Sequence, residues 1–184
     1  TNNGDATYTI TEVGPAGWIL DSVSSPCTKT SNTTATVTLT SSAPDVSCTF
    51  TNIQQKGSIT IVKDAQPDSS QDFAFTTTGT GLSDFSLDDD TDTTLSNTKT
   101  FSNLVAGTYT VTEGTVTSWD LSNLTCTDPT SNSTISGSTA TINLAPGENV
   151  TCTYTNTMRG VIGGYKYEDL DGNISTTGDR VNVP

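Results

Sequence analysis

The feature that most constrains how this chain can fold is an internal repeat. When the sequence is shifted against itself by about a hundred residues, six positions match in the same order. Tyr8 aligns with Tyr109, Glu12 with Glu113, Trp18 with Trp119, Cys27 with Cys126, Cys48 with Cys152 and Asn52 with Asn156. A second alignment places "GSITIVKD" over "GVIGGYKYED", so that Lys63 falls on Lys166. The fold must therefore suit a small module that is used more than once.

The two alignments divide the chain into three parts. Residues 57–159 are predicted to form one complete module, residues 1–56 the C-terminal half of a preceding module, and residues 160–184 the N-terminal part of a following one. The chain is therefore expected to begin and end within modules. Hydrophobic residues make up 31% of the sequence and aromatic residues 7%, which is enough for small cores but not for one large core.

Each module is predicted to be an all-β, Ig-like sandwich. The chain is rich in Thr, and no segment carries apolar residues at helical spacing over a dozen positions. Strands separated by turn residues are expected near residues 58–63, 72–77, 83–87, 98–102, 107–113, 119–126, 138–144 and 149–156. The predicted core contains Tyr109, Val111, Trp119, Leu121, Ile142 and Tyr154.

Charge and composition exclude several classes of function. The formal net charge of -13 argues against binding to nucleic acid or to an anionic membrane surface, because both would repel the chain. No apolar run is long enough to span a bilayer, so no membrane insertion is expected within this segment. The chain has no His, which removes most of the usual catalytic constellations, and an enzyme is not expected.

The four cysteines are predicted to form one disulfide in each module. The pairs Cys27–Cys48 and Cys126–Cys152 recur through the repeat, and buried free thiols explain that recurrence less well. Each bridge would close a loop of about 20 to 25 residues, worth about 3 kcal/mol in the chain-entropy model. Disulfides indicate an oxidising, extracellular setting. Five N-x-S/T triplets leave glycosylation open, although a Thr-rich chain contains such triplets by chance; they begin at Asn32, Asn123, Asn132, Asn149 and Asn173.

Glu113 occupies an unusual position for a carboxylate. In "GTYTVTE" it keeps step with Tyr109 and Val111, so a strand would point its side chain toward the core. A buried charge is costly unless it has a partner. Glu12 occupies the same position in "ATYTITE", so whatever role Glu113 has is expected twice.

Three segments together resemble the collagen-adhesin B-type (CnaB), prealbumin-like modules of bacterial surface proteins. They are a first strand ending in Lys ("ITIVKD"), a middle strand "YTVTE" followed by an aromatic residue, and a last strand ending in Asn ("CTYTNT"). The resemblance implies an isopeptide bond between Lys63 and Asn156, with Glu113 as the catalytic acid. The equivalent residues elsewhere in the chain are Glu12, Asn52 and Lys166.

The physical chemistry of burial is consistent with that bond. Desolvation favours a neutral, nucleophilic lysine amine and a protonated glutamic acid that can polarise the asparagine carbonyl. The alternative is that Lys63, Glu113 and Asn156 are solvated residues at strand ends. The sequence also departs from the family pattern "T-E-x-x-x-P-x-G", which survives as "TEVGPAGW" at 11–18 but becomes "TEGTVTSW" at 112–119. The loop after Glu113 is therefore expected to differ.

Two acidic segments are candidates for cation binding. In "EDLDGNISTTGD", Asp169, Asp171, Asn173 and Asp179 approximate the spacing of a calcium loop, and residues after 160 resemble the calcium-binding B repeats of staphylococcal Sdr-type adhesins. Ca²⁺ is the cofactor that this pattern predicts. The second segment, "SDFSLDDDTD", contains Asp84, Asp88, Asp89, Asp90 and Asp92, for which a solvated turn is an equally good interpretation.

Together these patterns predict a structural module of an extracellular, cell-surface stalk or filament. Its partners would be neighbouring modules or copies of itself, and in one version Lys166 of one copy would be joined to Asn52 of the next. The alternative is an adhesin module that binds a glycan or a host protein. Trp18 and Trp119 occupy equivalent repeat positions and are therefore expected in cores, which leaves few aromatic anchors for such a ligand.

Overall fold

The computed structural model describes residues 5–163, 167–169 and 180–182. Within these ranges the chain forms strands and turns and no helix, and so no helix that could cross a membrane. The all-β prediction is confirmed. The first five strands are β1 (Ala6–Thr11), β2 (Trp18–Val23), β3 (Thr28–Lys29), β4 (Thr34–Leu39) and β5 (Phe50–Gln54). We call residues 5–54 the N-terminal unit.

The next nine strands form what we call the central unit, residues 56–158. They are β6 (Lys56–Gln66), β7 (Ser69–Thr78), β8 (Phe85–Asp89), β9 (Thr98–Val105), β10 (Gly107–Glu113), β11 (Trp119–Thr127), β12 (Thr134–Ser136), β13 (Thr139–Leu144) and β14 (Asn149–Met158). Beyond them, β15 (Tyr167–Asp169) pairs antiparallel with β16 (Arg180–Asn182). Eight of the nine central strands match the predicted ones.

The predicted strand pattern missed β12. This strand has only three residues and lies in the turn-rich stretch "DPTSNSTISGS". It pairs with β13 through Thr134, Ile135 and Ser136, all of which are exposed. Because no side chain of β12 is buried, its sequence carries no alternation of apolar and polar residues from which a strand could be recognised.

The central unit is a sandwich of two sheets. One sheet has the order β12-β13-β10-β7-β8 and the other the order β11-β14-β6-β9. All neighbouring strands are antiparallel except β6 and β14, which run parallel with Lys63 opposite Tyr154. The first and last strands of the unit therefore lie side by side in the middle of one sheet.

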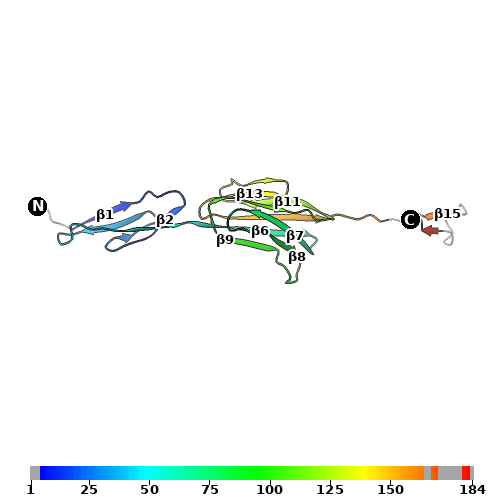
Figure 1. Cartoon of the computed structure of the whole chain (residues 1–184), viewed down its shortest axis with the longest axis horizontal. Helices are drawn as coiled ribbons and strands as arrows, with labels where there is room; N and C mark the ends of the chain where they lie inside the picture. The colour runs from blue at the N-terminus through cyan, green and yellow to red at the C-terminus, as the bar shows by residue number, and fades with distance from the viewer. Residues whose placement is uncertain (1–4, 164–166, 170–179, 183–184) are drawn as a thin grey trace.

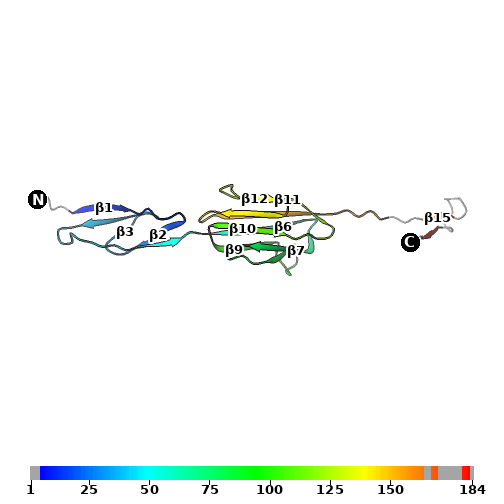
Figure 2. The same cartoon turned by 45° about the horizontal axis from the view of Figure 1, so that its top comes forward.

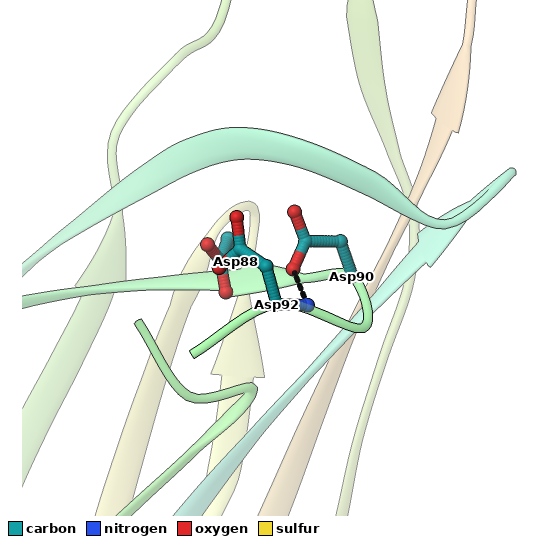
Figure 3. Close-up of side chains that lie close together, drawn as sticks. All are labelled: Asp88, Asp90 and Asp92. Carbon is teal, nitrogen blue, oxygen red and sulfur yellow. Dashed lines mark hydrogen bonds between the residues drawn. The ribbon is translucent and has the colours of Figure 1, made fainter. Parts of the chain in front are cut away.

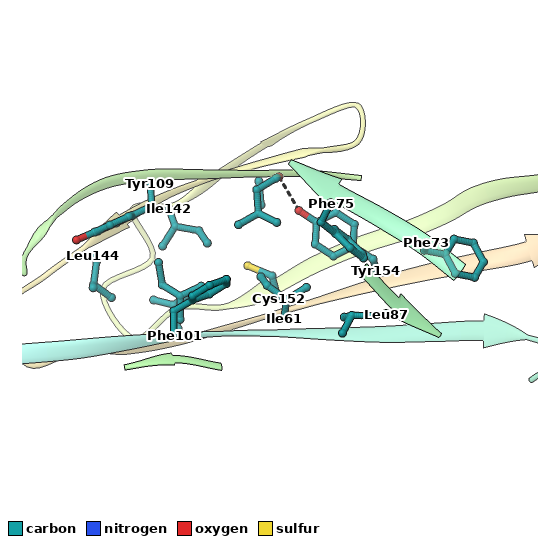
Figure 4. Close-up of a cluster of buried hydrophobic side chains, with 14 of the residues drawn as sticks. Ile61, Phe73, Phe75, Leu87, Phe101, Tyr109, Ile142, Leu144, Cys152 and Tyr154 are labelled. Carbon is teal, nitrogen blue, oxygen red and sulfur yellow. Dashed lines mark hydrogen bonds between the residues drawn. The ribbon is translucent and has the colours of Figure 1, made fainter. Parts of the chain in front are cut away.

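Side chains from the inner faces of both sheets fill the core (Figure 4). Along β6 every second residue from Gly57 to Ala65 is buried, and β13 and β14 show the same alternation. The hydroxyl of Tyr154 crosses the core from β14 to donate a hydrogen bond to the carbonyl of Val111 at 2.7 Å. Five of the six predicted core residues are buried, and Leu121 is half-buried against them. The expectation that Trp18 also lies in a core is wrong, because Trp18 is 42% exposed.

The N-terminal unit repeats part of this arrangement. Its sheets have the orders β1-β4-β3 and β2-β5, which correspond through the repeat to β10-β13-β12 and β11-β14. Figures 1 and 2 show the two units end to end. They are joined through Gln55, whose backbone N–H donates to the carbonyl of Gly17 at 2.7 Å. The last strand of one unit thus leads into the first strand of the next with one residue between them.

Candidate functional site

The inward face of β6 ends in a lysine. Lys63 follows Ile59 and Ile61 on the buried side of the strand and is 1% exposed. Its Nζ donates to Asn156 Oδ1 at 2.8 Å and to the carbonyls of Tyr154 and Asp64, each at 3.0 Å. Because a lysine ammonium has three donors, this set of acceptors satisfies it completely, and the solvated alternative for Lys63 is wrong.

Asn156 and Glu113 complete a buried group of three side chains. Asn156 lies on the inner face of β14, next to β6, and its Nδ2 donates to Glu113 Oε2 at 3.0 Å. Glu113 comes from β10 in the opposite sheet, and its Oε1 lies 3.8 Å from Lys63 Nζ without a hydrogen-bond partner. The prediction that Glu113 points into the core is confirmed, and the three residues lie within reach of one another.

Aromatic side chains pack beside this group. The Lys63 Nζ lies 4.1 Å from the centroid of the Phe73 ring. Trp119 packs edge-on against Phe73, with 5.4 Å between the ring centroids. Sequence reasoning did not identify Phe73 as part of the site. The signal was present in "DFAFT", where Phe73 and Phe75 share the inward face of a predicted strand.

Burial changes the protonation of the two ionisable groups in opposite directions. It lowers the pKa of Lys63, although the carboxylates of Glu113, Asp64 and Asp89 oppose this effect. Burial also raises the pKa of Glu113, against the hydrogen bond from Asn156 and the charge of Lys63. Both shifts favour the neutral forms, a free amine and a carboxylic acid. In its neutral form the Lys63 amine would be a nucleophile beside the side-chain carbonyl of Asn156.

The orientation of the Asn156 amide determines whether Glu113 contacts the amide oxygen or the amide nitrogen. Glu113 faces the amide nitrogen, and Lys63 faces the amide oxygen. The expected polarisation of the carbonyl by Glu113 would require the amide to turn over. As it lies, the Glu113 carboxyl bridges the amine and the nitrogen that would leave, which is suitable geometry for passing a proton between them.

The loop after Glu113 keeps its shape despite its changed sequence. Trp119 N–H donates to the carbonyl of Val116 at 3.2 Å, and in the N-terminal unit Trp18 N–H donates to the carbonyl of Pro15 at the same distance. The residue before each tryptophan has positive φ, 84° at Gly17 and 68° at Ser118. The expectation that the loop differs is therefore wrong for the turn that precedes the tryptophan.

The cysteines pair as the repeat predicted. Cys126 and Cys152 lie directly opposite each other on β11 and β14 and form a disulfide. Cys27 and Cys48 form the other, between segments that precede β3 and β5. There are no free cysteines in the described part of the chain. Both units therefore carry one covalent bridge.

The two acidic segments considered for cation binding differ in how much of them the structure describes. Asp84 accepts a hydrogen bond from the backbone of Thr77, and Asp89 accepts one from the backbone of Ala65, so both stabilise local structure. Carboxylate oxygens of Asp88, Asp90 and Asp92 gather at one point, as Figure 3 shows. Outside the described residues lie Lys166, Asp171, Asn173 and Asp179. Asp169 is described only as part of β15, so the predicted calcium loop stays a prediction.

The fold and the buried group together define a class of β-sandwich. In this class the first and last strands are parallel neighbours, and they carry a lysine and an asparagine that lie beside a glutamate of the facing sheet. Residues 59–158, more than half of the chain, match the family model described as the prealbumin-like fold domain. The chain belongs to this family.

No curated protein matches the chain. Among solved structures, the major pilin protein T-13 of Streptococcus pyogenes is 15% identical with a TM-score of 0.49, over 86% of this chain and 68% of the pilin. A bacterial adhesin from Mobiluncus mulieris, described as containing intramolecular disulfide, isopeptide and ester cross-links, is 16% identical with a TM-score of 0.41, over 64% of this chain. The chain spans 46% of that adhesin's length.

Proposed function

We propose that this chain is a structural part of an extracellular, cell-surface stalk or filament, in which the central unit is closed by an isopeptide bond between Lys63 and Asn156. The observation that carries the proposal is the buried contact of 2.8 Å between Lys63 Nζ and Asn156 Oδ1, with Glu113 on the other side of the same amide. An arrangement that buries a lysine, an asparagine and a glutamate is costly unless chemistry or pairing offsets the lost solvation.

The bond forms without an external reagent. The neutral Lys63 nitrogen bonds to the side-chain carbonyl carbon of Asn156, and the bond from that carbon to Nδ2 breaks. The proton that the amine loses passes through the Glu113 carboxyl to the departing nitrogen, which leaves as ammonia. Glu113 and Asn156 also line a surface hollow together with residues 114–117, which offers ammonia a route out. Because folding alone holds the reacting groups together, no substrate is bound and there is no turnover.

The position of the bond suits a mechanical role. The chain enters the central unit through β6 and leaves it through β14, and these strands are parallel neighbours. Tension on the two ends would therefore shear β6 past β14. A covalent bond between Lys63 and Asn156 connects these two strands directly, so the load bypasses the residues between them. Modules closed in this way resist extension without needing a large core.

The wider assignments rest on the same reasoning. We propose that residues 57–159 are one complete module, that residues 1–56 are the C-terminal half of another, and that residues 160–184 begin a further one. The partners are then neighbouring modules or copies of the chain. Ca²⁺ would be bound by Asp169, Asp171, Asn173 and Asp179. Two disulfides support the extracellular, cell-surface location.

Intact mass of the reduced chain tests the bond. The wild-type chain should be lighter than its sequence mass by one ammonia, and digestion should yield a branched peptide that links Lys63 to Asn156. A Glu113→Ala chain should have its full sequence mass. The matched control is Glu12→Ala, the repeat equivalent, which should keep the loss of ammonia. A wild-type chain at full sequence mass, or ammonia loss that persists in Glu113→Ala, would refute the assignment.

A further inference from the structure

One strand edge of the N-terminal unit is open within the described residues. β5 pairs with β2 along one edge, and no described strand pairs with its other edge. In the central unit the equivalent strand, β14, lies between β11 and β6, and β6 runs parallel to it. The free edge of β5 therefore offers unpaired backbone groups at the place where the central unit holds its first strand.

The apolar face beside this edge is open as well. Ile10 of β1 and Trp18 of β2 are exposed, whereas their repeat equivalents, Val111 and Trp119, are buried. The core that contains Val111 and Trp119 also contains Ile59 and other residues of β6. A strand with the alternation of β6 would pair with the free edge of β5 and bury this apolar face in the same step.

A pair of polar side chains at the open edge is arranged as it is in the central unit. Asn52 Nδ2 donates to Glu12 Oε1 at 2.6 Å, as Asn156 Nδ2 donates to Glu113 Oε2 at 3.0 Å. Asn156 Oδ1 accepts a hydrogen bond from Lys63 of β6, but no described residue donates to Asn52 Oδ1. The N-terminal unit thus keeps these acceptor groups in place without the strand that contacts them in the central unit.

The segment that follows β14 has the opposite character, because it is apolar and packs on no described strand. Residues 160–163 align with the start of β6, so that Ile162 corresponds to Ile59. Ile59 is buried, whereas Ile162 and its neighbour Val161 are almost fully exposed. Figures 1 and 2 show this segment beyond one end of the central unit and the N-terminal unit beyond the other. The open edge and the uncovered segment therefore lie at opposite ends of the central unit.

We propose that the segment beginning at Gly160 of one copy of this chain adds as a strand to the free edge of β5 in a second copy, parallel to β5. This inference rests on the proposed filament, but it does not require the bond between Lys63 and Asn156. Because β5 leads into the central unit, a parallel strand leaves the body of the donating copy beyond the N-terminal unit of the accepting one. The two surfaces are different, so the contact is heterologous and successive copies extend in one direction.

Sedimentation velocity of the full chain over a range of concentrations tests the association. The wild type should form multiples of 19.2 kDa that grow with concentration and separate on dilution. Salt should favour them, because it screens the repulsion between chains of net charge -13. A single species of 19.2 kDa at every concentration would overturn the proposal. Intact mass of the same samples reports the bond between Lys63 and Asn156 separately, so the two proposals can fail independently.

Two neighbouring substitutions separate strand addition from unspecific apolar association. Ile162→Lys places a charge at the inward position of the added strand and should weaken the association about tenfold or more. Val161→Lys changes a residue that would face outward, as Ser58 does in β6, and should have little effect. The matched control Ile135→Lys changes an exposed isoleucine of β12 and should have none. Equal weakening by Ile162→Lys and Val161→Lys would contradict a strand with one face in the core.

A peptide with the sequence of residues 56–66 probes the accepting edge, because β6 occupies the equivalent edge in the central unit. The peptide should dissociate the multiples and reduce the acrylamide quenching of Trp18 in the Trp119→Phe chain. A peptide of the same composition in scrambled order should do neither. In dilute solution without peptide the copies separate, so Trp18 stays accessible. Protection of Trp18 by the peptide, in a wild type that does not associate, would exclude a second copy as the source of the strand and would overturn the proposal.

Discussion

The two units of this molecule share a repeated sequence but differ in what that sequence is able to bury. Tyr8 is 52% exposed and its equivalent Tyr109 is 4% exposed; Trp18 and Trp119 are 42% and 7% exposed. The strand pairs themselves are the same, because β1 pairs with β4 as β10 pairs with β13. The same strand pairing therefore occurs in both units, but equivalent aromatic side chains are exposed in the N-terminal unit and buried in the central unit.

The difference comes from four strands of the central unit. Within the described residues, the N-terminal unit has no strands that correspond to β6, β7, β8 and β9. Of these strands, β6 supplies Ile59 and Ile61 and β7 supplies Phe73 and Phe75, all of which pack in one core with residues of β10 and β14. Alternation along a strand determines which face is apolar, whereas burial depends on strands that come from other parts of the sequence.

The buried group of Lys63, Asn156 and Glu113 shows the same contrast. In the N-terminal unit Asn52 Nδ2 donates to Glu12 Oε1 at 2.6 Å, as Asn156 does to Glu113. The central pair faces Lys63, but no lysine of the described residues occupies that position beside Glu12 and Asn52. The glutamate–asparagine hydrogen bond thus forms between β1 and β5 in one unit and between β10 and β14 in the other. The lysine beside it comes from β6 and is described only in the central unit.

The largest effect should come from replacing Asn156. Asn156→Ala would prevent the proposed cross-link between residues 93 apart, which the chain-entropy model values at about 4.7 kcal/mol for a loop of that size. It also leaves Lys63 and Glu113 buried without the amide between them. At 4–8 °C per kcal/mol for a domain of about a hundred residues, the unfolding temperature should fall by about 20 °C or more. Scanning calorimetry measures the change.

The equivalent change in the N-terminal unit is the control. Asn52→Ala removes a half-buried side chain whose hydrogen bond is to Glu12 alone, and it should leave the main transition within a few degrees of the wild type. If Asn156→Ala lowered the transition no more than Asn52→Ala, the proposed covalent closure of the central unit would be wrong. Intact mass on the same samples shows whether the bond was present.

Removing a disulfide should have the next largest effect, with different consequences in the two units. The bridges span 21 and 26 residues, so each contributes about 3 kcal/mol in the chain-entropy model. Cys126→Ala/Cys152→Ala should leave the central unit folded but less stable. Cys27→Ala/Cys48→Ala should unfold the N-terminal unit locally, because its open core has little stability to lose.

Hydrogen–deuterium exchange resolves the two outcomes strand by strand. In Cys27→Ala/Cys48→Ala, amides of β1, β4 and β5 should exchange at rates close to those of an unfolded chain, while β6 to β14 keep their protection. Protection retained in β1 and β4 would show that the N-terminal unit is covered by something other than the strands described. The comparison between the units would then need to be revised.

Much of the fold and of the site could be predicted because both depend on local alternation and on the repeat. Glu113 could be placed inside because it keeps step with Tyr109 and Val111, and the cysteine pairs could be assigned because they recur. Phe73 could not be linked to Lys63, since β7 and β6 lie in different sheets and only the packed sandwich brings them together. The orientation of the Asn156 amide likewise depends on which neighbours surround it.

Fluorescence quenching examines the contrast in burial directly, since each unit contains one tryptophan. Trp119→Phe leaves Trp18 as the single reporter, and Trp18→Phe leaves Trp119. Acrylamide should quench Trp18 several-fold more efficiently than Trp119, because Trp18 is 42% exposed and Trp119 is 7% exposed. Equal quenching constants would indicate that the apolar face of the N-terminal unit is covered in solution.

The smallest expected effect concerns the loop in which the two units differ in sequence but not in shape. Ser118 adopts φ of 68° where the N-terminal unit has Gly17 at 84°, and a left-handed conformation costs a non-glycine residue roughly 1–2 kcal/mol. Ser118→Gly removes that cost but adds roughly 0.5–1 kcal/mol of backbone entropy on folding. The net gain in stability should therefore be about 0.5–1 kcal/mol, seen as a rise of a few degrees in unfolding temperature.

Two further substitutions test whether strain in this turn is the cause. Ser83→Gly changes an exposed loop serine that is not in the left-handed region, so it should lower stability slightly through entropy alone. Gly17→Ser should destabilise the N-terminal unit, because it creates the strain that Ser118 carries and places a Cβ 3.1 Å from Pro146 Cγ. If Ser118→Gly were no more stabilising than Ser83→Gly, the serine would be held by contacts that offset its φ. The two turns would then share a backbone conformation, but Ser118 would not destabilise the central unit.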